Sequence, residues 1–296
     1  AEAAELWPLV EWCLEYCRRQ LTADGVVASD TDELEGRFPT GDANLCTSTL
    51  YYDALLSAVS LGRELGVESA QTARYAAQAG VLARAIDAHF GGEVGGYDTY
   101  RYYAGNTLLR SWICMPLIVG LKERSEGTVR ALLGPELMTD DGLLTQQGSS
   151  TFWDRSTLYA LRGIYNVGQA DRATELLHRY SQRRLLGDHV PYPIEAWPEG
   201  SQRHLSAESG LYCRIITEGL FGIRPTGLRS FDLTPSMPAA WESMSLRHIR
   251  AFGSDFDITV ARVADGRLRI TVARPGAKPK IYRAAPGATI RVKLTD

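Results

Sequence analysis

Acidic residues gather at two loop-like places in this chain, and a pair of carboxyl groups can serve as general acid and general base. The stretch SDTDELEGRFPTGDANLCTSTLYYDALL, residues 29–56, begins with a dense run of acids and continues as a helix pattern. The acids of this first cluster are Asp30, Asp32, Glu33 and Glu35. A second stretch, PYPIEAWPEG, supplies Glu195 and Glu199. The two clusters can act on one molecule only if the fold brings their loops together.

The first cluster has two interpretations. Negative charge is favourable near a helix N-terminus, and that explains Asp42 just before the helix pattern. It explains four acids within seven residues less well. The other interpretation is a catalytic carboxyl group at the mouth of a cavity, where Leu34 and Phe38 would supply the apolar contact that raises its pKa.

Composition excludes several functional classes. The 296 residues are 45% hydrophobic and 23% charged, which is typical of a globular protein. A net charge of -3 predicts no nucleic-acid or anionic-membrane partner, and no apolar run is long enough for a transmembrane helix. The five cysteines and five histidines match no metal-binding pattern, so no metal and no cofactor is predicted. The compartment is not determined, but the odd cysteine number and the absence of a signal-peptide pattern favour the cytoplasm.

Hydrophobic periodicity predicts a mainly helical chain with a small β-domain at its end. Helices are predicted over 5–21, 44–65, 69–90, 106–123, 153–167, 170–184 and 206–221. Alternating residues on both sides of Asp265-Gly266 predict a hairpin with a type I′ turn. The resulting organisation is a helical domain over 1–222, a Pro-rich linker over 223–242 and an antiparallel β-domain over 243–296.

The loops between the predicted helices are alternately short and long. The long loops cover 22–43, 91–105, 138–152 and 185–205. If successive helices run antiparallel, all long loops emerge on the same face. Binding groups concentrate on loops held by a rigid scaffold, so this face is the expected place of a functional site.

Three stretches carry a resemblance to a known group of enzymes. SDTDELEGRFPTGDANLCTSTLYY is similar to an acidic loop followed by an Asn-bearing helix, and TFWDRSTLYALRGIYNVGQADRATELL to an aromatic-plus-Arg segment that opens a late hairpin. PYPIEAWPEG with SAESGLYCRIITEGLFGIRP is similar to a base-bearing loop and last inner helix. The chain thus resembles the six-hairpin, or (α/α)6-toroid, glycosidases, especially glycoside hydrolase families 63 and 65 and the trehalase-like enzymes. The stretch LTPSMPAAWESMSLRHIRAFGSDFDITV is similar to their terminal β-domain.

The resemblance implies an (α/α) toroid of helical hairpins that is incomplete here. A full toroid needs twelve helices, and the sequence predicts about seven. The N-terminal hairpins of the family pattern have no counterpart in this sequence. The expected partners are therefore a carbohydrate substrate and either another chain or a missing N-terminal segment that completes the toroid.

The resemblance also implies an inverting glycoside hydrolase that uses two carboxyl groups. It aligns a family "DE" pair, which supplies the general acid, with Glu33, and Asp32 and Glu35 are the alternatives. Glu195 is the expected general base, because prolines stiffen its loop and a rigid group can hold the attacking water. Glu199 is the alternative base.

Other loop residues fit a sugar subsite. Aromatic rings offer stacking surface to the apolar faces of sugars, and Arg forks match pairs of hydroxyls. The expected substrate-binding residues are Arg37, Tyr100, Trp153, Arg155, Trp197 and Arg203. Two other functions stay open: a carbohydrate-binding protein without catalysis, or a fragment of a longer enzyme, and a toroid-fold sugar phosphorylase or epimerase.

Overall fold

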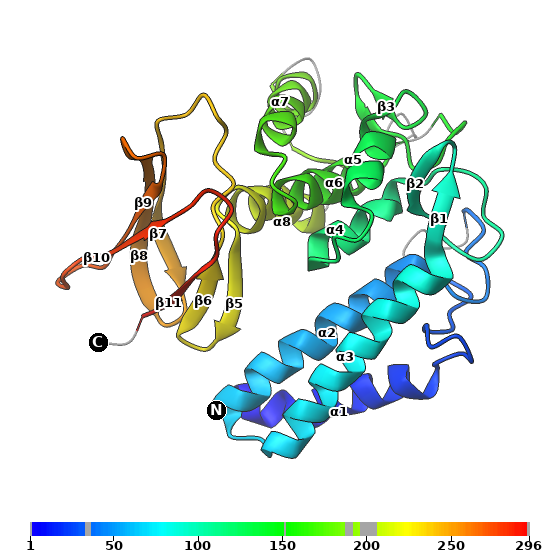
Figure 1. Ribbon diagram of the computed structural model, residues 1–296, viewed down its shortest axis with the longest axis horizontal. Coiled ribbons are helices and arrows are strands. Elements are labelled where there is room, and N and C mark those ends of the chain that lie inside the picture. The colour runs from blue at the N-terminus through cyan, green and yellow to red at the C-terminus, as the bar shows by residue number, and fades with distance from the viewer. Residues whose placement is uncertain (1, 33–36, 151, 187–191, 196–205, 295–296) are drawn as a thin grey trace.

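The computed structural model describes residues 2–32, 37–150, 152–186, 192–195 and 206–294 (Figure 1). The chain is mainly helical up to Leu220 and forms antiparallel strands after it, as the sequence predicts. The helical elements are α1 (Glu2–Arg19), α2 (Leu45–Leu65), α3 (Ser69–Phe90), η1 (Ser111–Cys114), α4 (Met115–Val119), α5 (Ser125–Leu133), α6 (Asp154–Asn166), α7 (Ala170–Tyr180), η2 (Ser181–Leu185), α8 (Ser206–Arg214) and η3 (Ile215–Leu220).

The first three helices pack together at one end of the molecule (Figure 1). Helix α2 begins after Asn44, whose side chain accepts a hydrogen bond from the Thr47 N–H as an N-cap. It ends at Gly66, whose positive φ of 73° allows the backbone to turn out of the helix. A side chain at Gly62 would collide with Trp7 of α1, so this glycine lets α1 approach α2 closely.

Residues 91–105, which the sequence suggests as a loop, contain a β-hairpin instead. Strands β1 (Gly91–Val94) and β2 (Tyr97–Tyr100) pair in antiparallel register. Gly95 and Gly96 both have positive φ, which is the requirement of a type I′ turn. The helix predicted over 106–123 is also shorter, because its N-terminal part is extended and Arg110 pairs with Gln146.

The predicted linker over 223–242 is wrong in its first half. It contains β5 (Ile223–Gly227) and β6 (Ser230–Leu233), which form a three-stranded sheet with β11 (Ile290–Lys293) near the chain end. Phe231 and Leu233 alternate with polar residues and point into the core. The prolines nearby disguise this strand pattern, because proline is normally a signal against a sheet.

A four-stranded antiparallel sheet completes the β-region. Its strands, in spatial order, are β10 (Lys280–Ala284), β9 (Leu268–Ala273), β8 (Ser254–Arg262) and β7 (Ser243–Ala251). The predicted β8–β9 hairpin is present, but its turn is not type I′, because only Gly266 and not Asp265 has a positive φ. A turn from Val263 to Gly266 closes a three-residue loop, the next most common hairpin connection.

The two sheets contact each other through aromatic rings. Phe231 of β6 stacks on Phe252 and Phe256, with ring centroids 5.0 and 5.6 Å away. The buried apolar side chains form one cluster that runs from the helices into both sheets. Among the described residues, no helix is long and apolar enough to cross a lipid bilayer.

Buried tyrosines make this fold sensitive to alkaline pH. Burial raises the pKa of Tyr51 to about 12, and burial also raises the pKa values of Tyr100, Tyr102 and Tyr180. The unfolded chain ionises tyrosine near pH 10. The stabilising contribution is therefore fully present below pH 10 and is lost as the pH rises through the folded pKa values.

We expect the free energy of unfolding to fall above pH 10 by about 1.4 kcal/mol per pH unit for each buried tyrosine. Denaturant titrations at several alkaline pH values measure the slope, and phenolate absorbance counts the ionised tyrosines. Ionisation of all 14 tyrosines near pH 10 in a chain that stays folded would contradict this expectation.

Candidate active site

The first long loop contacts the segment that follows β2. Strand-like bridges join Ala28 to Ala43 and Asn44 to Tyr103, so the first long loop lies beside the segment after β2. The Tyr102 hydroxyl donates a 2.7 Å hydrogen bond to Oδ2 of Asp32. That bond fixes the carboxylate of Asp32 against a rigid part of the scaffold.

Arg110 clamps three of these segments together. Its side chain is fully buried, its Nε donates to Oε1 of Gln146 at 2.9 Å, and its guanidinium donates to the Pro39 carbonyl at 2.5 Å. The guanidinium also lies 5.1 Å from the ring centroid of Phe38 and 4.8 Å from that of Tyr102. These contacts hold the first loop near residues 138–152, although the segments are far apart in the sequence.

Trp153 is where the first loop meets the start of α6. The Cζ atom of Arg37 lies 5.4 Å from its ring centroid, and that of Arg155 lies 4.7 Å away. Both distances are within the range of a cation–π interaction. Trp153 is only 3% exposed, so in this structure the ring holds two guanidinium groups rather than presenting an open stacking platform.

Arg155 stands between two carboxylates. Its terminal nitrogen lies 2.9 Å from Oε1 of Glu208 in α8 and 3.9 Å from Oε1 of Glu195. The Glu195 carboxylate is partly exposed, whereas that of Glu208 is fully buried. Burial raises the pKa of Glu208, although Arg155 acts in the opposite direction. The guanidinium group of Arg155 is thus shared between a buried carboxylate and a partly exposed one.

A buried ion pair holds the backbone next to Glu195. Asp154 and Arg184 are each 2% exposed, and Oδ1 of Asp154 lies 3.1 Å from a terminal nitrogen of Arg184. The other oxygen, Oδ2, accepts a 2.6 Å hydrogen bond from the Ile194 N–H. Arg184 also donates to the Asp141 carbonyl. The position of Glu195 therefore depends on a charge that water does not reach.

The structure describes some of the predicted site residues and not others. Glu33, Glu35, Trp197, Glu199 and Arg203 lie outside the described residues. Of the others, Arg37, Trp153, Arg155 and Glu195 come together in one connected set of contacts. Asp32 lies close to Arg37 in the sequence, and its hydrogen bond with Tyr102 holds it in place.

Tyr100 does not face a cavity. The side chain is 1% exposed and packs in the hydrophobic core at the end of β2. The sequence reasoning placed Tyr100 at the substrate because it lies in a run of four tyrosines. Tyr100 pairs with Gly91 of β1, and both faces of β2 are buried at this end, because Thr99 on the other face is buried as well. In the same run, Tyr102 makes a polar contact with the acidic loop, because its hydroxyl donates a hydrogen bond to Asp32.

Sequence reasoning missed Glu208 and Arg110. Glu208 lies in SAESG, at the start of a helix, where an acid looks like an ordinary first-turn charge. Arg110 follows a pair of leucines and precedes a buried run, so a charge there is unusual. That local signal was available for Arg110, but its partners are distant in the sequence.

Asn44 links the start of α2 to the acidic loop, and this gives a testable consequence. Besides capping α2, its amide donates a 3.0 Å hydrogen bond to the Thr31 carbonyl next to Asp32. We expect Asn44→Ala to lower the free energy of unfolding by about 1–2 kcal/mol, since a cap and a second bond are lost. Chemical denaturation measures the loss. Asn44→Asp, which keeps the cap oxygen, should cost less, and equal losses in both variants would contradict the capping role.

No group of three or more His, Cys, Asp or Glu side chains within the described part of the chain is arranged to hold a metal ion. The charged groups of the site are carboxylates and guanidinium groups. Their arrangement can move protons and bind hydroxyl-bearing or charged ligands.

Comparisons with known proteins give a likeness of fold. The chain matches no protein-family model and no curated protein sequence. Among solved structures it is similar to a family 78 rhamnosidase of Bacillus sp. GL1, with a TM-score of 0.60, 15% identity, and coverage of 95% of this chain and 30% of that chain. It is also similar to an α-L-rhamnosidase of Streptomyces avermitilis (TM-score 0.49, 13% identity, 98% and 31% coverage).

A third similar structure is the neutral trehalase of Saccharomyces cerevisiae, with a TM-score of 0.49, 15% identity, and coverage of 64% of this chain and 40% of that chain. The chain therefore spans less than half the length of each of these proteins. Assignment to glycoside hydrolase families 63 or 65 stays a prediction, as does the toroid. The likeness to the Bacillus rhamnosidase shows that this chain shares its fold with a stretch of a larger protein.

Proposed function

We propose that this chain carries the site of an inverting glycoside hydrolase. The observation that supports this most is the set of contacts from Arg37 through Trp153 and Arg155 to the half-exposed carboxylate of Glu195. It joins the first acidic loop to the second, as a two-carboxylate mechanism requires. The fold likeness to a rhamnosidase is consistent with this proposal.

Glu195 is the proposed general base. In an inverting reaction, the base removes a proton from the attacking water while an acid protonates the leaving oxygen from the other side. A terminal nitrogen of Arg155 lies 3.9 Å from Oε1 of Glu195, and the ion pair of Arg155 with Glu208 holds that guanidinium group in place. The Ile194 N–H donates a hydrogen bond to Asp154. This bond holds the backbone that carries the Glu195 side chain.

A carboxyl group of the first loop is the proposed acid. Asp32 accepts a hydrogen bond from the Tyr102 hydroxyl, which occupies one oxygen of its carboxyl group and fixes its position. Asp32 is therefore proposed as a group that orients the substrate. We therefore keep the neighbouring Glu33, which lies outside the described residues, as the proposed acid. Arg37 and Arg155 would bind substrate hydroxyls or a carboxylate.

The test is hydrolysis with a stereochemical readout. The protein is incubated with a panel of aryl glycosides and oligosaccharides that includes α-L-rhamnosides and trehalose, and proton NMR identifies the first anomer released. We expect hydrolysis of at least one member with inversion at the anomeric carbon. Retention would overturn the two-carboxylate inverting assignment. Saturable sugar binding without any hydrolysis would favour the carbohydrate-binding alternative, and turnover only with phosphate would favour a phosphorylase.

A further inference from the structure

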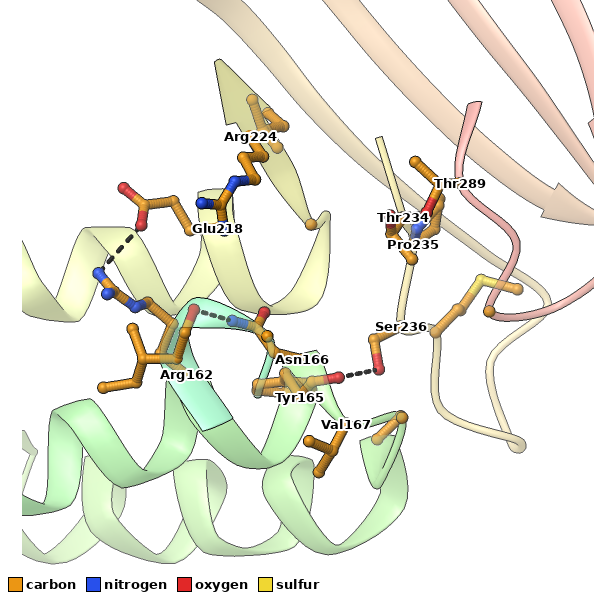
Figure 2. Close-up of a pocket in the computed structure, with 18 of the residues that line it drawn as sticks. Arg162, Tyr165, Asn166, Val167, Glu218, Arg224, Thr234, Pro235, Ser236 and Thr289 are labelled. Atoms are coloured by element: carbon orange, nitrogen blue, oxygen red, sulfur yellow. Dashed lines mark hydrogen bonds and ion pairs between the residues drawn. The ribbon is translucent and has the colours of Figure 1, made fainter. Parts of the chain in front are cut away.

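A cavity separate from the candidate active site lies between the helices and the β-region (Figure 2). Its volume is about 780 Å³, and its walls come from α2, the C-terminal part of α6, η3, β5 and the segment after β6. Its lining includes none of the residues of the candidate active site. Along α6, Arg155 of that site and Arg162 of the cavity wall are seven residues apart, roughly 10 Å at 1.5 Å per residue.

Positive charge exceeds negative charge around this cavity. The cationic lining residues are Lys122, Arg162, Arg214, Arg224 and Arg262, and the anionic ones are Asp53 and Glu218. The guanidinium group of Arg262 is already engaged, because it donates hydrogen bonds to the backbone carbonyls of Trp241 and Pro238. Arg224 pairs with Asp53 at 2.5 Å. Within the described ranges, Lys122 forms no ion pair, so the cavity retains uncompensated positive charge.

Arg162 is the buried member of this group. It is 7% exposed, and its Nε finds no hydrogen-bond partner in the described structure. Its terminal nitrogen lies 2.9 Å from Oε2 of Glu218. That same carboxylate accepts two hydrogen bonds from Arg214, at 2.6 and 3.0 Å. One carboxylate therefore serves two guanidinium groups, and one of these is almost entirely out of water.

A buried cation with an incomplete set of acceptors is costly for a protein. Burial lowers the pKa of Arg162, and the positive charge of Arg214 acts in the same direction. An additional anion at this place would satisfy donors of both guanidinium groups. Planar guanidinium groups bind phosphate and carboxylate oxygens through paired hydrogen bonds.

The facing wall carries hydroxyl groups. Figure 2 shows Thr234, Ser236 and Thr289 across the cavity from Arg224 and Glu218. The hydroxyls of Thr234 and Thr289 are 2.8 Å apart, and that of Ser236 donates to the Tyr165 carbonyl. Each hydroxyl keeps further capacity to donate or accept. This wall suits the hydroxyl-bearing part of a ligand.

We propose that this cavity binds a small ligand that carries a phosphate or carboxylate group. The oxyanion lies against Arg162, Arg214 and Arg224, and the remainder of the ligand lies against Thr234 and Ser236. The proposal does not depend on the glycosidase assignment, because no residue of the candidate active site lines this cavity.

Isothermal titration calorimetry on the full chain tests the proposal with four probes: inorganic phosphate, glucose 6-phosphate, glucuronate and neutral glucose. We expect saturable binding, at millimolar affinity or better, of one or both oxyanion classes and much weaker binding of glucose. Binding of both phosphate probes without glucuronate assigns a phosphate ligand, and the reverse assigns a carboxylate. Equal affinity for glucose, or no binding by any probe, overturns the proposal.

Variants locate the binding. Lys122→Gln and Arg224→Gln each remove an exposed charge without changing the buried Arg162. Arg224→Gln should weaken binding about tenfold, the loss expected for one charge-assisted contact, and Lys122→Gln should weaken it less, because Lys122 lines the cavity outside the proposed oxyanion contacts. Lys122→Gln leaves no ion-pair partner behind, whereas Arg224→Gln leaves Asp53. Arg250→Gln is the matched control, because Arg250 is a highly exposed arginine of β7 that does not line the cavity. Unchanged affinity in both cavity variants, or an equal loss in Arg250→Gln, places the binding elsewhere and overturns the proposal.

Discussion

Glu195→Gln should lower kcat of the proposed hydrolysis by about a hundredfold to ten-thousandfold, the range that a general base contributes. The substitution keeps the size of the side chain and the backbone bond from Ile194 to Asp154. It removes only the ability to accept a proton from water. Because the change acts on the transition state, KM should change much less than kcat.

Two further variants sharpen this test. Glu242→Gln changes an exposed glutamate far along the chain, before β7, and should leave kcat unchanged. Glu195→Ala should regain activity when a small anion such as azide is added, because the anion can take the place of the missing carboxylate group. A Glu195→Gln variant with the kcat of the unchanged protein would remove Glu195 from the mechanism, whatever the substrate.

Local signals predict much of the helical region. Helices α2 and α3 follow from apolar periodicity bounded by Asn44 and Gly66, and the structure places them at nearly the predicted ends. These elements are set by residues within a few positions of each other. The hairpin β8–β9 follows from period-two alternation for the same reason.

The errors come from contacts that are distant in the sequence. Strands β5 and β6 were hidden within a Pro-rich segment, and their sheet is completed by β11, about 60 residues later. Tyr100 was expected at the substrate because a run of tyrosines does not indicate which of the rings the core covers. Glu208 was missed because its importance comes from Arg155, a residue in another helix.

In the candidate site, too, local signals were predicted and contacts distant in the sequence were not. Sequence reasoning selected residues on the loops that do meet, since Arg37, Trp153, Arg155 and Glu195 are in one set of contacts. It did not identify the buried charges behind them, which hold those residues in place. A scaffold of ion pairs cannot be inferred from spacing, because each partner alone resembles an ordinary surface charge.

Asp154→Ala should destabilise the protein by about 3–5 kcal/mol, because it leaves the charge of Arg184 buried without its carboxylate partner. It also leaves the Ile194 N–H without an acceptor next to Glu195. Chemical denaturation measures the first effect. The second should lower kcat even under conditions where the variant is fully folded, since the base loses its fixed backbone.

The double variant Asp154→Leu/Arg184→Met separates charge from packing. Apolar residues of similar volume can replace a buried ion pair at little cost, whereas removal of one partner is costly. We therefore expect the double variant to be more stable than Asp154→Ala, although the Ile194 N–H still lacks its acceptor. As a control, Asp255→Ala breaks an exposed pair with Arg250 and should cost no more than about 1 kcal/mol. A double variant no more stable than the single one would contradict the assignment of this loss to the unpaired charge of Arg184.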